Sequence, residues 1–330
     1  MKIVRKALLA TAVATALSPA AVMADTTLFG NFDIAVAIES ADETALAVEE
    51  SGNTDDNVIG IEGDIELENG NSVTYQYTAT VNFDGGDAFA SNYHSYIGYK
   101  WDSVELRAGT QDLPLRLVLD KADLFAATYA DQNNIIGSQN GAPFGAGNTT
   151  AGSSVMLLGS SDSLAYAISL DTSNEDSNDD DSSDGIRFGA MVDFTISDNS
   201  SVALGVETLT DQYTAVGLSA NVGVSDSTDL TLAVNNYTED GVGSDATEVI
   251  LGAAFGVSDV TTLKAQVGTS DIDDVDDDAV YFAIGADFAL ADNVTTYVLA
   301  ASGTDGGLSS TNEQDDGDAS VLAGGIKLSF

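Results

Sequence analysis

Residues 59–83 read IGIEGDIELENGNSVTYQYTATVNF, and apolar and polar residues alternate on both sides of one turn. Successive side chains of a β-strand point to opposite faces, so an alternation of period two gives each strand one apolar and one polar face. The central Asn69-Gly70-Asn71 supplies the residues that a tight turn requires. The stretch therefore predicts a β-hairpin with one apolar face.

The same alternation continues through the chain, and in the second half it is joined by a repeated turn. Four segments are near-copies of one another and begin 28, 33 and 33 residues apart: Ile196–Ser200, Val224–Thr228, Val257–Thr261 and Leu290–Val294. This spacing is that of a hairpin-sized repeat. Between consecutive copies the chain returns through longer acidic connections, so short polar turns alternate with long loops.

The first 24 residues have the features of a secretory signal peptide. Three basic residues precede an apolar run over residues 7–17, and Val22 and Ala24 supply the small residues at positions −3 and −1 of a cleavage site. The apolar run of about 11 residues is far shorter than the roughly 20 that a membrane-spanning helix needs. We therefore expect cleavage between Ala24 and Asp25, which leaves one domain over residues 25–330.

The alternation predicts sixteen strands in this domain. They lie near residues 26–39, 57–69, 72–84, 89–101, 103–109, 152–160, 163–171, 185–196, 201–209, 213–224, 229–237, 247–257, 262–270, 279–290, 294–301 and 319–330. An even number of strands places both ends of the chain on the same side. About 19 residues are available per strand with its connection, which suits the tilted strands of about 9–11 residues that cross a membrane.

The composition excludes several classes of function. The 330 residues include 53 acids, 10 bases, one His and no Cys, and the formal net charge is −43. Without Cys there is no disulfide, zinc–thiolate site or Cys nucleophile, and one His cannot build a His-rich metal site. So few bases cannot form a positive surface for nucleic acid. We expect a protein that is not an enzyme and has no cofactor and no metal site.

The apolar face of the strands is expected to meet lipid. No stretch of 18 apolar residues follows the signal peptide, which excludes membrane-spanning helices. In a soluble barrel of sixteen strands, the apolar face would line a lumen too wide for side chains to fill. A wet polar lumen and a lipid-facing apolar surface satisfy every strand. The sequence therefore predicts an all-β transmembrane antiparallel β-barrel of 16 strands, with a soluble secreted all-β protein as the alternative.

Three segments resemble the general bacterial porins of Gram-negative outer membranes. Residues 25–33 resemble the first porin strand, residues 93–112 the stretch that leads into the third loop, and residues 325–330 the closing strand with its terminal aromatic. The resemblance implies a homotrimer in the cell outer membrane of a Gram-negative bacterium, in contact with outer-membrane lipids, with its long third loop folded into the pore. It also implies that the outer-membrane assembly machinery reads the last strand through Ile326, Leu328 and Phe330.

The resemblance further implies a constriction between the third loop and the barrel wall. The connection over residues 110–151 is the longest, and its part 113–129 is apolar enough to rest against a wall. The matching loop acids are Asp112, Asp120, Asp123 and Asp131, and the matching wall bases, on the polar parity of their strands, are Arg107, Arg187 and Lys264. The alternative is that each base pairs with a nearby lumen acid such as Glu62, Glu105 or Asp193.

These features predict a water-filled channel for passive diffusion of ions and small hydrophilic solutes. The charge of −46 without the signal peptide (−43 less three bases) favours inorganic cations. A substrate-specific channel and a non-conducting structural or adhesin barrel remain alternatives. A barrel hydrolase is disfavoured because only His94 is available and no acid sits beside it in the sequence. The surplus carboxylates also predict a marine or halophilic source, because salt screens their repulsion.

Overall fold

The computed structural model describes residues 25–40, 44–50, 57–83, 92–132, 150–172, 185–240, 245–273, 278–304, 308 and 318–330. The strands are β1 Asp25–Ser40, β2 Thr44–Glu50, β3 Val58–Glu66, β4 Ser72–Thr80, β5 Asn92–Trp101, β6 Val104–Asp112, β7 Thr150–Ser160, β8 Leu164–Asp171, β9 Arg187–Ser197, β10 Ser200–Leu209, β11 Tyr213–Ser225, β12 Thr228–Glu239, β13 Ala246–Ser258, β14 Thr261–Ile272, β15 Ala279–Ala291, β16 Val294–Thr304 and β17 Ala319–Ser329. A short helix, α2 (Pro114–Leu119), and a 3-10 turn, η2 (Asp120–Ala122), follow β6. Among these residues no helix is both long and apolar enough to cross a membrane.

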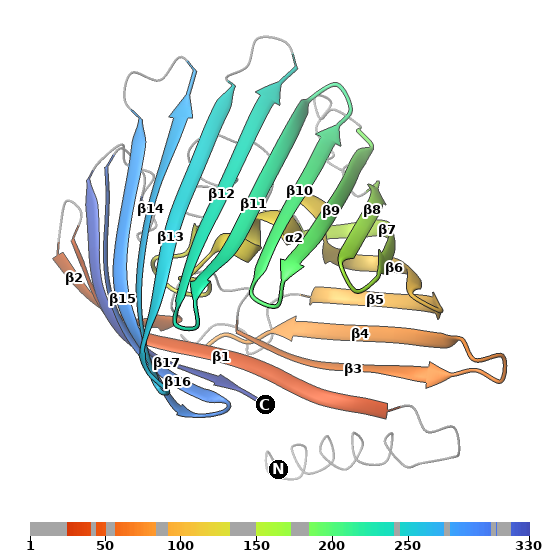
Figure 1. Cartoon of the computed structure of the whole chain (residues 1–330), viewed down its shortest axis with the longest axis horizontal. Helices are drawn as coiled ribbons and strands as arrows, with labels where there is room; N and C mark the ends of the chain where they lie inside the picture. Colours follow the sequence, from red (N-terminus) through yellow and green to blue (C-terminus); the bar gives the residue numbers. More distant parts are fainter. Residues whose placement is uncertain are drawn as a thin grey trace, which may run out of the picture.

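The strands form one antiparallel sheet that closes on itself (Figure 1). From β3 to β17 each strand pairs with the next, and β17 pairs with β1 from Asn31 opposite Ser329 to Ser40 opposite Ser320. Along the other edge of β1, residues Asp25–Asn31 pair with β3 and residues Ile34–Ser40 pair with β2. The strands β2 and β3 therefore occupy a single position in the sheet. The result is a barrel of sixteen positions, which confirms the predicted all-β antiparallel barrel. The segment β2 is a strand that the sequence did not predict.

The two faces of the sheet differ as the alternation predicts. Large apolar side chains such as Leu204, Val216 and Leu251 are exposed on the outside. Their neighbours in sequence point inward, where small and polar residues predominate, as at Gly205 and Glu207. An outer apolar band around a polar interior is the arrangement that a lipid bilayer requires.

The four repeated turns are short connections with a common hydrogen bond. Each joins two strands through two residues, as at Asp198-Asn199 between β9 and β10. The carbonyl of the second turn residue accepts a backbone N–H from the strand after next, as from Gly223 to Asn199 (3.0 Å). Equivalent bonds follow the other three turns. These bonds tie the short-turn end of the barrel together.

The described part of the long connection after β6, residues 113–132, is called the inner segment here, because it packs against the inward face of the wall. Leu115 and Leu119 are fully buried, and they face Gly217 on β11. Further along, Leu124 faces Gly252 on β13. Since glycine carries no side chain, these wall positions leave room for the leucines (Figure 1 shows α2 against β9–β11).

Candidate pore constriction

Two of the predicted loop acids, Asp112 and Asp120, flank the guanidinium of Arg116 on α2. Arg116 Nε lies 3.3 Å from Asp120 Oδ2 and 3.6 Å from Asp112 Oδ1. Its Nη2 donates to the hydroxyl of Tyr93 on β5 (2.9 Å). The other oxygen of Asp112 lies 3.1 Å from His94 Nε2. Arg116 of the inner segment thus pairs with one acid of the same segment, Asp120, and with Asp112 at the end of β6.

The surroundings of Asp120 shift its proton affinity. Desolvation, followed by repulsion from Asp131 and Asp112, raises the pKa of Asp120 to about 7, and Arg116 opposes this rise. The side chain nevertheless keeps 42% of its surface accessible inside the barrel. Desolvation lowers the pKa of Arg116, but its carboxylate neighbours outweigh this effect and raise it. The surroundings of Asp120 therefore favour the protonated form of its carboxyl group more than water does.

The other two predicted loop acids hold together a turn unit, defined as residues 123–132. Asp123 Oδ1 accepts the N–H of Phe125 (2.8 Å), and its Oδ2 accepts the N–H at the far end of the unit (3.2 Å). Asp131 Oδ2 accepts the N–H of Ala127 (2.9 Å), whose φ of 57° lies in the left-handed region. These bonds fix the shape of the turn unit internally.

Two of the predicted wall bases, Arg107 and Arg187, pair with acids of the wall. Arg107 forms a two-pronged ion pair with Glu105 on the same strand (Nε–Oε1 2.8 Å, Nη2–Oε2 3.0 Å), as the alternative interpretation expected. Arg187, toward the long-loop end of β9, lies 3.6 Å from Asp171 and 3.7 Å from Glu207. The structure places these two bases in separate parts of the barrel.

The third predicted wall base, Lys264 on β14, lies beside the inner segment. Its Nζ is 2.8 Å from Asp287 Oδ2 on β15 and 4.8 Å from the ring centroid of Phe125 in the turn unit. A cation over an aromatic ring is attracted to its π face. Lys264 therefore pairs with a wall acid, as the alternative interpretation expected, and also contacts the turn unit; its role in a constriction stays a prediction.

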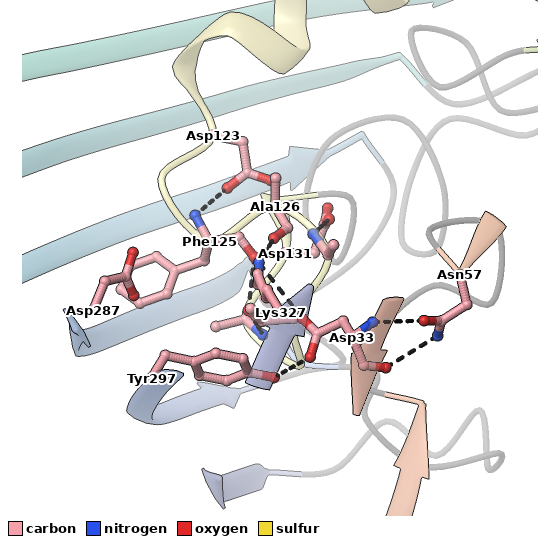
Figure 2. A network of polar contacts seen from close by, with 12 residues as sticks. Asp33, Asn57, Asp123, Phe125, Ala126, Asp131, Asp287, Tyr297 and Lys327 are labelled. Carbon is pink, nitrogen blue, oxygen red and sulfur yellow. Dashed lines mark hydrogen bonds and ion pairs between the residues drawn. The ribbon is translucent and has the colours of Figure 1, made fainter. Parts of the chain in front are cut away.

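Sequence reasoning missed three bases that contact the same region: Arg116, Lys121 and Lys327. Lys327 on β17 lies 3.6 Å from Asp33 Oδ2 and donates a hydrogen bond to the carbonyl of Ala126 (Figure 2). The parity rule could have found Lys327, because it lies between the outward-facing Ile326 and Leu328. Arg116 and Lys121 belong to a segment without strand parity, so no comparable signal marks them.

The C-terminal residues lie on the outer face of the closing strand. The backbones of Phe330 and Gly30 exchange two hydrogen bonds of 3.0 Å each. The Phe330 ring lies 5.6 Å from that of Phe32. The three predicted assembly residues are exposed on the outside: Ile326, Leu328 and Phe330. Their recognition by assembly machinery stays a prediction.

The predicted cleavage position straddles the boundary of the described residues. Asp25 is the first residue of β1, and Ala24 lies outside the part of the chain that the structure describes. Cleavage there stays a prediction.

The comparisons with known proteins agree with this architecture. Three of the similar solved structures are an anion-selective porin from Comamonas acidovorans (18% identity, 93% of this chain and 100% of that chain, TM-score 0.80), OmpT, an outer membrane protein of Vibrio cholerae, in a trimer form (12%, 92% and 99%, 0.66), and a triple mutant of Rhodopseudomonas blastica porin (17%, 92% and 100%, 0.65). At these identities the likeness concerns the fold. The curated proteins include no match to the sequence.

The sequence itself matches the family described as Gram-negative porin over residues 10–307. This match covers most of the chain, and the closed barrel of sixteen positions agrees with it. The chain therefore belongs to the Gram-negative porin family, and it is an outer-membrane channel protein rather than an enzyme.

Proposed function

We propose that the chain forms a water-filled channel through which ions and small hydrophilic solutes diffuse passively, and that the channel prefers cations. The polar inward face of the closed sheet supports a wet lumen. The inner segment lies against the inner face of β9–β13, which supports a narrowing of the lumen at this level. The groups that passing solutes meet there include Asp120, Lys121 and Lys327.

The proposed cation preference is carried by one observation: six of the seven bases in the described part of the chain are matched by acids. A carboxylate oxygen lies within 4 Å of each of Arg107, Arg116, Lys121, Arg187, Lys264 and Lys327. Two of these bases, Arg116 and Arg187, each have two carboxylate neighbours. A matched base attracts anions weakly, whereas surplus carboxylates concentrate cations in the lumen.

The name of the Comamonas acidovorans protein states anion selectivity. Selectivity depends on the charged side chains that line each pore, and these can differ widely between proteins of one fold. The proposal of cation selectivity for this chain therefore rests on its own charges.

A substrate-specific channel is the second candidate, and one hollow in the barrel favours it. This hollow has a volume of about 640 Å³ near the short-turn end, and it brings charged groups of both signs beside an aromatic ring: Glu62, Asp64, Lys100, Glu105, Arg107 and Tyr96. A site of this kind would hold a polar solute. Solute flux that saturates with concentration would support this candidate.

Three further expectations are part of the proposal. A homotrimer is supported by the similar OmpT of Vibrio cholerae, whose solved structure is of a trimer form. Export through a cleaved signal peptide is supported by the sequence of the first 24 residues. A saline habitat is supported by the net charge of −43. If the source lives in a saline habitat, the thermal stability of the purified barrel should rise with salt concentration, because salt screens the repulsion between carboxylates.

The decisive test is single-channel recording of the purified protein in a planar bilayer with a KCl gradient. We expect conductance steps in groups of three and a reversal potential of the cation-selective sign. A reversal potential of the opposite sign contradicts the proposed selectivity, and an absence of conductance contradicts the channel itself. Liposome swelling with neutral sugars of graded size then separates general diffusion from a specific channel.

A matched pair of variants links the selectivity to the interior acids. Asp120→Asn removes a carboxylate of the inner segment, and we expect it to reduce the cation preference. Asp226→Asn removes the same charge at a short turn between β11 and β12, and we expect a smaller change. Equal effects of the two variants would show that the overall charge, and not the region of the inner segment, sets selectivity.

A further inference from the structure

The turn unit, residues 123–132, behaves as one piece because hydrogen bonds connect its parts. Besides the bonds of Asp123 and Asp131 described above, Thr128 Oγ1 donates to the carbonyl of Phe125 (2.6 Å) and accepts the N–H of Ala130 (3.1 Å). A segment whose parts are connected by this many internal hydrogen bonds moves as a single unit. Its contacts with the wall therefore determine where it lies in the lumen.

Three strands hold the turn unit through hydrogen bonds at different points. Gln266 Oε1 on β14 accepts the N–H of Leu124 (3.0 Å), and the Tyr281 hydroxyl on β15 donates to the carbonyl of Ala130. Both of these wall residues are almost completely buried. The third contact is the hydrogen bond from Lys327 Nζ on β17 to the carbonyl of Ala126, between the other two along the chain.

Lys327 differs from the other two contacts because it lies at the seam where the barrel closes. It is directly opposite Asp33 in the pairing of β17 with β1, and its Nζ lies 3.6 Å from Asp33 Oδ2. Asp33 in turn accepts a hydrogen bond from the Tyr297 hydroxyl (3.0 Å), and the side chain of Asn57 binds its backbone N–H and carbonyl (Figure 2). The acid that orients Lys327 is therefore held on several sides.

We propose that Lys327 is a positioning residue that couples closure of the barrel to the seating of the turn unit. The ammonium group lies between two fixed oxygens, one on the first strand and one in the turn unit. The geometry that aims it at Ala126 exists only when β1 and β17 are paired. This inference rests on the proposed channel function, because the position of the turn unit sets the width of the pore.

The test compares Lys327→Met with Asp226→Asn in the full-length mature protein. Each change removes one charged side chain, but Asp226 lies in an exposed short turn between β11 and β12, away from the inner segment. We expect Lys327→Met to raise single-channel conductance in 1 M KCl by ~1.5-fold or more, since charge effects are screened within about 3 Å at this salt concentration. It should also admit larger neutral sugars in liposome swelling. Asp226→Asn should match the wild type in both measurements.

Chemical rescue provides a test within one folded barrel. The chain contains no Cys, so Lys327→Cys offers a single thiol. Aminoethyl methanethiosulfonate reacts with its thiolate, releases methanesulfinate and leaves an aminoethyl group attached through a disulfide. This group restores an ammonium and should reduce the sugar flux toward the wild-type value. Ethyl methanethiosulfonate, which attaches an ethyl group without the ammonium, should not reduce it.

The outcomes separate the inference from the proposed function. A wild-type protein without conductance contradicts the channel. A conducting wild type whose conductance and sugar exclusion are unchanged in Lys327→Met contradicts the positioning role, as does equal restoration by the two reagents. Heat-dependent mobility of the unboiled protein in SDS gels verifies that the barrel of each variant is closed.

Discussion

Lys121 of η2 lies 2.7 Å from Asp193 of β9, so here the inner segment contributes the base and the wall contributes the acid. This polarity is the reverse of the acidic loop and basic wall that the family resemblance implies. Arg116 likewise places a base in the loop, between two loop acids. The interior therefore presents mixed charges on both sides, and its net negative charge comes from their balance.

We predict that Lys121→Met increases the cation preference, because Asp193 then loses the base that neutralises it. Asp193→Asn should decrease the preference, and the double variant should return close to the wild type. The reversal potential in a KCl gradient measures all three. Since 37% of the Lys121 side chain is exposed, screening limits the cost in stability to about 1 kcal/mol or less. Equal shifts in the same direction for both single variants would contradict the pairing.

We predict that Gly217→Ala disturbs the seating of α2. An added Cβ would lie 2.5 Å from Leu115 Cδ1, which is closer than real Cβ atoms come to a neighbour, and 3.0 Å from Leu119 Cδ2, which is a tight contact. Overpacking of this kind costs about 1–3 kcal/mol. We expect a lower thermal midpoint and a changed conductance. Gly324→Ala is the matched control, because its Cβ would meet its nearest neighbour at 3.5 Å, an ordinary contact.

We predict that the cation preference falls as the pH is lowered from 8 to 6. The pKa of Asp120 is raised to about 7, mainly by desolvation and also by Asp131 and Asp112, so its negative charge is lost over this range. Reversal potentials at several pH values measure the effect. Asp120→Asn should reduce it, and a pH dependence that is the same in Asp120→Asn and the wild type would contradict the prediction.

We predict that the raised pKa of Asp120 also makes the stability of the folded barrel depend on pH. An acid whose pKa is higher in the folded state than in the unfolded chain binds its proton more tightly when folded. The contribution of Asp120 to stability therefore falls as the pH rises from 3.8, the ordinary pKa of an aspartate side chain, toward 7. Asp120→Asn should reduce this loss between pH 5 and 8 in thermal melts. If the melting temperatures of the variant and the wild type change with pH by the same amount over this range, the raised pKa of Asp120 is contradicted.

The sequence was sufficient to predict the barrel, because each strand carries its own two-faced pattern and each short turn repeats one motif. It did not predict β2 (Thr44–Glu50). This strand occupies the same sheet position as β3, and its pairing with Ile34–Ser40 of β1 was not evident from its local pattern.

The interior was less predictable than the wall. The polar parity located Arg107, Arg187 and Lys264 on strands, but it could not tell which of them meets the inner segment. Lys327 has the same parity signal, yet its partner Ala126 is 201 residues away along the chain. Contacts of this range depend on how the whole barrel closes, which local patterns do not record.

We predict that Phe330→Ala impairs assembly more than the loss of one exposed aromatic side chain explains. Phe330 is 49% exposed, and its ring covers Gly30, where a Cβ would lie 2.6 Å from the ring. Phe282→Ala is the matched control, because Phe282 is 48% exposed on the outer face of β15. If the last strand is read by the assembly machinery, the amount of heat-modifiable barrel in outer membranes should fall for Phe330→Ala and stay near the wild-type amount for Phe282→Ala.

Refolding of the same two variants into detergent separates recognition from stability. Without assembly machinery, both changes remove one phenylalanine ring from the outer surface, so the two should refold to similar extents. A loss in cells that is absent in vitro then assigns the role of Phe330 to recognition. A refolding defect specific to Phe330→Ala would instead assign it to the packing of the closing strand over Gly30 and beside Phe32.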